Sequence, residues 1–271
     1  PILTVDASTP TTLDDMAERT RLVITTVGPY SKYGLPLVQA CAKAGTDYAD
    51  LTGEAMFVRQ SIDDFHKQAV DTGARIVHAC GFDSVPSDMT VYALFSRARQ
   101  DGAGDLLDTN YVLRDFAGGV SGGTIASMTE VMRAASNDPE IRKTLEDPYT
   151  LTQDRGAEPE FGPQPDLPWR RGRDIAPELA GVWAGGFVMA PYNTRIVRRS
   201  GTTLAAITAP AATPTATTPC RSAAWSSRND SCVCAHFSTM NCRVAPAPQN
   251  SVVTASDTWP SLSRHSAALQ A

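Results

Sequence analysis

Long apolar runs are absent from this 271-residue chain, and so is any excess of basic residues. No stretch approaches the roughly 18–20 consecutive apolar residues that a membrane-spanning helix needs. The first residues have neither the basic start nor the apolar centre of a signal peptide, which predicts a cytoplasmic protein and leaves peripheral membrane association open. The formal charge of −5 and the pI near 5.4 give no electrostatic reason to expect a nucleic-acid partner.

Charge is also scarce within one part of the chain, residues 201–271. Of the 24 Lys and Arg, 20 lie before residue 201, and so do 27 of the 29 Asp and Glu. The remainder is rich in Ala, Thr, Ser and Pro, which predicts an irregular, disordered C-terminal tail over 201–271. Its four cysteines, Cys220, Cys232, Cys234 and Cys242, do not have the spacing of paired zinc ligands, so we expect no metal.

Strand and helix patterns alternate in the first hundred residues. Apolar, β-branched runs predict four strands, over residues 1–5, 22–30, 46–51 and 74–79. Two of the intervening helices are predicted to end at Gly45 and Gly73, because glycine readily adopts the left-handed conformation that closes a helix. Strands that alternate with helices across short loops predict an α/β fold with a parallel, doubly wound sheet.

The alternation of strand and helix patterns ends near residue 104. We expect a second, mixed α+β region over 105–200, with a strand over 108–116 and a helix that begins near Gly122. Four apolar residues at helical spacing are expected to face inward: Ile125, Met128, Val131 and Met132. The pattern over residues 147–180 predicts a long irregular loop, and that over residues 183–190 predicts a strand or a buried segment.

The predicted strand ends should meet at one edge of a parallel sheet, where such folds bind their ligands. Glycine at such an edge lets a backbone N–H approach a phosphate or a ring closely. The expected cofactor-binding residues are Asp6, Val27, Gly28, Pro29, Tyr30, Gly81 and Phe82. The alternatives are that these loops are ordinary turns and that Asp6 caps the following helix. His78 is interpreted as a core histidine with satisfied hydrogen bonds rather than as a base.

Polar residues and glycines further along the chain form a second candidate set. Residues 81–88 contain a glycine, two aspartates and two serines, which exceeds what one helix cap needs, although either serine could cap the helix. Residues 118–124 are glycine-rich but lack the P-loop lysine and the Rossmann spacing, so we interpret them as a tight turn against a ligand. The expected substrate contacts are Asp83, Ser84, Asp88, Gly122 and Gly123.

Eight segments that include these residues resemble the saccharopine dehydrogenase-like oxidoreductases. The segments are 25–30, 33–38, 44–54, 78–88, 121–124, 154–160, 176–181 and 193–200. Within that family they are most similar to the mycobacterial trans-acting enoyl reductases. The resemblance extends over essentially all of residues 1–200.

The resemblance implies an incomplete Rossmann-like, NAD(P)-binding domain over 1–104 and a partial substrate domain over 105–200. The mycobacterial relatives are associated with phthiocerol and phenolic glycolipid assembly, which implies a long acyl substrate presented by a polyketide synthase. Hydride would pass from NADPH, expected ahead of NADH, to the β-carbon of a double bond, and a protein acid would protonate the α-carbon. Tyr30 is the first candidate for that acid and Asp83 is the second.

Two departures from the family pattern leave the activity of this chain open. The family opens with a glycine-rich loop that binds the cofactor pyrophosphate, and we expect this chain to start downstream of that loop. The likeness also stops after Ser200, as it would after a frameshift in a GC-rich gene. One alternative is a non-catalytic fragment that associates with lipid or with a synthase. The other is a saccharopine-type amino acid dehydrogenase, whose basic cluster for two carboxylates would come from Arg155, Arg170, Arg171 and Arg173.

Overall fold

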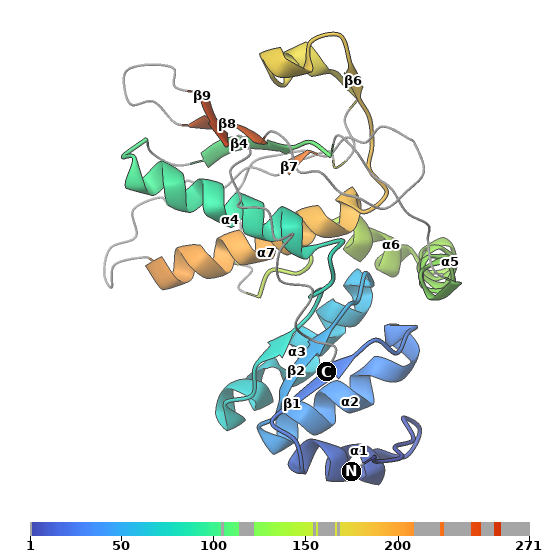
Figure 1. Ribbon diagram of the computed structural model, residues 1–271. Helices are drawn as coiled ribbons and strands as arrows, with labels where there is room; N and C mark the ends of the chain where they lie inside the picture. The colour runs from blue at the N-terminus through green and yellow to red at the C-terminus, as the bar shows by residue number, and fades with distance from the viewer. Residues whose placement is uncertain are drawn as a thin grey trace, which may run out of the picture.

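The computed structural model describes residues 2–103, 106–113, 122–153, 156, 166, 169–208, 223–224, 240–244 and 252–255. Three helices pack on a small parallel sheet at one end of the molecule (Figure 1). Two long helices lie together with a second sheet at the other end (Figure 1). None of the described helices is long and apolar enough to cross a membrane. The fold is thus α/β with a parallel sheet, as predicted.

The first sheet contains the parallel strands β1 (Leu22–Thr25), β2 (Asp47–Asp50) and β3 (Ile76–Val77), in that order. Three of the four predicted strands are therefore confirmed, each shorter than expected. The strand predicted over residues 1–5 is wrong, because residues 2–5 join no sheet and Ile2 is fully exposed. A short apolar run becomes a strand only where a neighbouring strand completes its hydrogen bonds.

The helices of this first group are α1 (Pro10–Glu18), α2 (Tyr30–Ala44) and α3 (Ala55–Thr72). Helix α2 ends at Gly45, with φ of +74°, and α3 ends at Gly73, with φ of +81°. Both predicted helix ends are confirmed, since these φ values are strained for residues with a Cβ.

The helices cover one face of the sheet. Val23, Tyr48 and Ile76 are partners in the register of the three strands and lie in the core with α1, α2 and α3. The next partners along the strands belong to the opposite face, where Ile24 is 68% exposed and Val77 is 50% exposed. A parallel sheet is usually covered on both faces. Here the second face is open in the described residues.

The second group is built on α4 (Val85–Gln100) and α7 (Ala190–Thr208), which pack against each other (Figure 1). Tyr192 and Ile196 of α7 belong to the same buried cluster as the core of the first group. The two groups therefore share apolar packing, and the predicted division near residue 104 stays a prediction.

Strand β4 (Leu106–Tyr111) belongs to a second sheet with β7 (Ala223–Ala224), β8 (Met240–Val244) and β9 (Val252–Ala255). It runs parallel to β7 and antiparallel to β8. Within residues 201–271 the structure describes the end of α7, which continues to Thr208, and three short paired segments. The irregular tail over this range stays a prediction.

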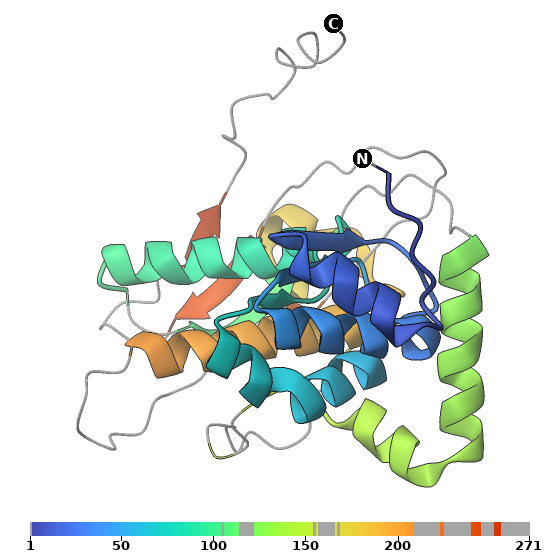
Figure 2. The same ribbon diagram turned by 90° about the horizontal axis from the view of Figure 1, so that it is seen from below.

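Helix α5 (Gly122–Asn137) and helix α6 (Pro139–Glu146) lie between β4 and α7 in sequence. Figure 2 shows α5 along one side of the molecule. The expectation that its four apolar residues face inward is wrong for Ile125 and Met132, which are mostly exposed, whereas Met128 and Val131 are half-buried. Helical spacing identifies an apolar face but does not say which surface covers it.

Candidate functional site

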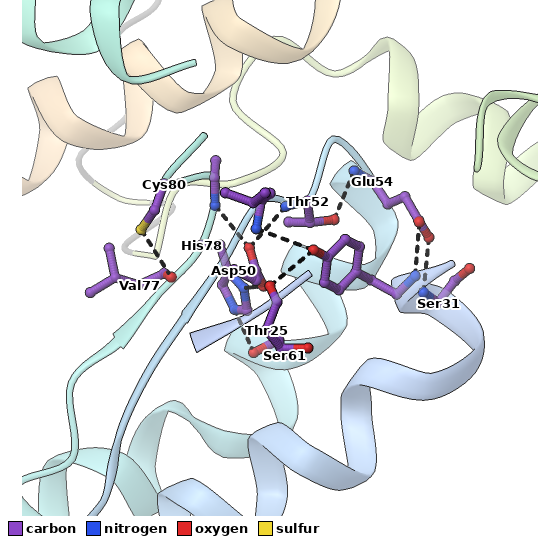
Figure 3. A network of polar contacts seen from close by, with 12 residues as sticks. Thr25, Ser31, Asp50, Thr52, Glu54, Ser61, Val77, His78 and Cys80 are labelled. Carbon is purple, nitrogen blue, oxygen red and sulfur yellow. Dashed lines mark hydrogen bonds and ion pairs between the residues drawn. The ribbon is translucent and has the colours of Figure 1, made fainter. Parts of the chain in front are cut away.

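The carboxyl ends of the three parallel strands lie at one edge of the first sheet (Figure 3). Three loops follow these strands, over residues 26–29, 51–54 and 78–84. Side chains from these loops and from the helices that begin after them form two hydrogen-bonded networks. This edge is the candidate site.

The first network is centred on the buried carboxylate of Asp50. Its Oδ2 lies 2.6 Å from His78 Nδ1, and its Oδ1 accepts the backbone N–H groups of Thr52 and Ala79, both at 3.0 Å. The other imidazole nitrogen of His78, Nε2, lies 2.9 Å from Ser61 Oγ on α3. The interpretation of His78 as a satisfied core histidine is confirmed. A buried carboxylate needs such partners, because an unpaired buried charge is strongly unfavourable.

This carboxylate–imidazole–hydroxyl chain has the order of a hydrolase triad, but its position argues against that chemistry. Ser61 is buried within α3, so an external acyl group has no access to its hydroxyl. Ala79 has φ of +61°, which costs an L-residue about 1 kcal/mol. Its N–H donates to Asp50, so the network holds the end of β3 in this conformation.

The second network is centred on Glu54, which is also buried. Its carboxylate accepts the backbone N–H groups of Tyr30 at 2.9 Å and Ser31 at 2.8 Å. It also accepts the hydroxyl of Ser127 on α5 at 2.8 Å. These N–H groups belong to the first turn of α2, where a negative charge is stabilised by the helix dipole. The anion-binding end of α2 is thus occupied by a carboxylate of the chain itself.

Tyr30 is the first residue of α2, not a loop residue, and it is buried. Its hydroxyl donates to the carbonyl of Thr25 at 3.2 Å and accepts the N–H of Leu51 at 3.3 Å. Burial, together with the charges of nearby carboxylates, raises the pKa of Tyr30. The phenolic proton is therefore strongly held and directed to the backbone. The role of Tyr30 as proton donor stays a prediction.

The loop after β3 carries Gly81, Phe82 and Asp83. A Cβ on Gly81 would lie 2.5 Å from Asp83 Oδ1, so a side chain at position 81 would displace that carboxylate. Phe82 is 64% exposed and Asp83 is also exposed. Partial desolvation raises the pKa of Asp83 above its ordinary value. This loop presents a ring and a carboxyl group at the surface of the edge.

Two other predicted substrate contacts connect the loop region to α7. The buried Ser84 hydroxyl donates to Asn193 Oδ1 at 2.7 Å, and the Asn193 amide donates to the carbonyl of Asp83 at 2.7 Å. Asp88 accepts the hydroxyl of Ser200 at 2.9 Å, and burial raises the pKa of Asp88 to about 6. Both side chains have partners inside the protein, which supports a structural role for each.

The remaining predicted residues are placed as follows. Asp6 accepts the N–H and the hydroxyl of Ser8 at 2.8 and 2.7 Å, so it builds the turn before α1. Val27 and Gly28 are exposed, and a cis peptide joins Gly28 to Pro29. Gly122 and Gly123 open α5, and Gly122 faces open space. Residues 118–121 lie outside the described residues.

The arginines proposed for a saccharopine-type site are not at this edge. Arg170 and Arg171 form a short strand and Arg173 follows it, at the far end of the second group (Figure 1). Arg155 lies outside the described residues. Within the described part of the chain, no three His, Cys, Asp or Glu side chains are grouped to hold a metal ion.

Sequence reasoning missed the residues that organise the edge, namely Asp50, Glu54, Ser61 and Asn193. The first two were visible as acids at a strand end, but their partners were not. Asn193 lies more than a hundred residues from Ser84 in the chain. No local pattern signals a bond between residues so far apart.

The fold and the edge together define a class: an α/β protein whose candidate ligand site lies at the carboxyl end of a parallel sheet. No family model matches the chain, and no solved structure matches it. Its likeness to named proteins comes from sequence comparison with curated relatives.

The chain is 66% identical over 201 residues to the trans-acting enoyl reductase of Mycobacterium tuberculosis, covering 74% of this chain and 48% of the relative. It is 64% identical over 201 residues to the trans-acting enoyl reductase of Mycobacterium ulcerans, with the same coverage. A further M. tuberculosis protein, whose name assigns this activity provisionally, is 72% identical over 204 residues, 75% of this chain and 49% of its own. The chain is thus close in sequence to trans-acting enoyl reductases and spans about half their length.

Proposed function

We propose that this chain contributes to an NAD(P)H-dependent enoyl reductase. The observation that carries the proposal is the identity of 64–72% to proteins named for that activity, over about three quarters of the chain. The strand-end edge supports it, because dinucleotide cofactors bind at such edges in α/β folds. The substrate we propose is a long acyl chain on a polyketide synthase in the assembly of polyketide-derived lipids such as phthiocerol and phenolic glycolipids, in the cytoplasm.

The edge fits the nicotinamide half of a cofactor better than the phosphate half. The N–H groups of Tyr30 and Ser31 are taken by Glu54, so the start of α2 offers a phosphate no free donors. The exposed side chains of Val27 and Phe82 offer apolar contact to a flat ring. We therefore assign residues 27–29 and 81–82 to the ring of NADPH, which we prefer to NADH.

A reduced nicotinamide bound here would supply the hydride for the β-carbon of an α,β-unsaturated acyl chain, and the protein would have to supply a proton to the α-carbon. Asp83 is better placed than Tyr30 to give that proton. Its carboxyl group is exposed at the edge, and its pKa is raised by partial desolvation, which favours the protonated form. The hydroxyl of Tyr30 is directed to the carbonyl of Thr25 instead.

Apolar side chains around the same edge suit an acyl chain. Leu51 follows β2, and Val85 and Met89 lie in the first turns of α4. All three side chains are partly exposed. A Cβ on Gly81 would lie 3.5 Å from Leu51, so this side chain borders the loop that carries Asp83. An acyl chain laid along these residues would bring its double bond toward that carboxyl group.

Titration of the chain with NADPH, followed by cofactor fluorescence, tests the proposal. Phe82→Ser should weaken binding about tenfold by removing a contact to the ring. Val70→Ser on α3 is the matched control, because Val70 is exposed to the same degree, and it should leave binding unchanged. Asp83→Asn should slow reduction of an unsaturated acyl thioester without weakening NADPH binding. No binding at millimolar NADPH would favour a non-catalytic fragment and contradict the proposal.

A further inference from the structure

A short hairpin at the far end of the second group carries an unusual pair of side chains. Its strands are β5 (Arg170–Arg171) and β6 (Trp183–Ala184), antiparallel, with Arg171 opposite Trp183. Figure 1 shows this segment projecting at the outer edge of the molecule, away from the strand-end site. Trp169, which precedes β5, is 76% exposed, and Trp183 is 61% exposed.

The hairpin is firmly held from its inner side. Ala176 and Leu179 pack against Val112, which follows β4, and Gly172 donates its N–H to the carbonyl of Val182 at 2.7 Å. The ring of Trp169 also lies so close to Gly185 that a Cβ there would be 3.0 Å from it. The two indoles are therefore displayed on an ordered element.

Positive charge accompanies the indoles. The Arg171 guanidinium lies 5.5 Å from the centre of the Trp183 ring, and Arg173 is exposed nearby. The segment from 169 to 185 contains three arginines and two acids, Asp174 and Glu178, which gives a local charge of +1 in a chain of net charge −5. Arg173 lies 3.9 Å from Asp174. The hairpin is thus a basic, aromatic projection on an acidic protein.

We propose that this hairpin docks the protein on a membrane surface that contains anionic phospholipids. Indole rings partition to the boundary between headgroups and acyl chains, with the ring in the apolar layer and the N–H on polar groups. Arginines beside such rings contact lipid phosphates and are attracted by the negative surface. A projecting element with two exposed indoles can enter a bilayer surface without a preformed pocket in the partner, which favours lipid over an acidic protein.

Co-sedimentation with vesicles tests the proposal on the full chain. Binding to vesicles of phosphatidylcholine mixed with phosphatidylglycerol is expected, with much weaker binding to phosphatidylcholine alone. Arg171→Gln with Arg173→Gln should weaken binding to the mixed vesicles about thirtyfold, because each arginine near an anionic surface is worth about 1 kcal/mol. Trp183→Ser should weaken binding to both kinds of vesicle, since the indole contact does not depend on lipid charge.

Two controls keep the test specific to the hairpin. Lys67→Gln removes an exposed cation of α3, and Met132→Ser removes an exposed apolar side chain of α5. Neither should change vesicle binding. The proposal would be overturned if these control variants lost as much vesicle binding as the hairpin variants, or if the parent protein did not bind the mixed vesicles. Binding to polyglutamate but not to vesicles would show that the hairpin takes an acidic protein, which also overturns it.

Discussion

Replacement of Glu54 should destabilise the protein more than its position in a loop suggests. The carboxylate accepts the N–H groups of Tyr30 and Ser31 and the hydroxyl of Ser127. Glu54→Ala leaves all three donors without this acceptor, and two of them are the first N–H groups of α2. A buried donor that loses its partner costs about 1–3 kcal/mol, so we expect a loss of about 3 kcal/mol in the free energy of unfolding.

Glu54→Gln removes the charge of the side chain and keeps its shape. The amide keeps one acceptor oxygen but places an NH₂ group beside an N–H donor, so about half of the alanine effect, about 1.5 kcal/mol, is expected. The control is Glu140→Gln, since Glu140 is an exposed acid in the first turn of α6. It should cost less than about 0.5 kcal/mol, because exposed charge–dipole interactions are small.

Urea unfolding followed by circular dichroism measures these differences. Inorganic phosphate gives a second readout, because Glu54→Ala opens the start of α2 to an external anion. Phosphate should raise the melting temperature of this variant more than that of the parent. A loss below about 0.5 kcal/mol for Glu54→Ala, or a larger loss for Gln than for Ala, would refute the reasoning.

Two further predictions concern buried groups. Burial raises the pKa of Asp88 from 3.8 to about 6. The free energy of unfolding then falls by at most about 3 kcal/mol as pH rises from about 4 to about 6, because Asp88 ionises at lower pH in the unfolded chain than in the folded protein. Asp88→Asn should remove this loss, so that the free energy of unfolding measured in urea is higher for the variant than for the parent at neutral pH but not at about pH 4. Parallel pH profiles of the two proteins would contradict this prediction. Ser61→Ala removes the hydroxyl partner of His78 Nε2 and should cost about 1–2 kcal/mol by the same assay, with no change arguing against the network.

The sequence predicted the elements of the first group well because its signals there are local. Periodicity and glycine positions depend only on neighbouring residues, and they located three strands and the ends of α2 and α3. The strand expected over residues 1–5 failed for a non-local reason, because the apolar pattern had no partner strand. The inward face of α5 failed likewise, since what covers a helix is set by distant segments.

The position of the candidate site was predictable, but the hydrogen bonds that its side chains make were not. Strand ends of a parallel sheet meet by topology, so the loops near residues 28, 52 and 81 could be grouped in advance. Glu54 reaches α2 from a loop 24 residues away, and Asn193 reaches Ser84 from α7. Such bonds depend on packing that a single sequence does not reveal.

Burial divides the carboxylates of this edge into two kinds. Asp50 and Glu54 are buried, and each is engaged by backbone N–H groups, so their charges hold the loops in place. Asp83 is exposed beside Phe82, and partial desolvation raises its pKa. Substitution of either buried acid therefore changes folding and chemistry together. Asp83 is exposed, so under the proposed function its substitution is the one that separates proton transfer from stability.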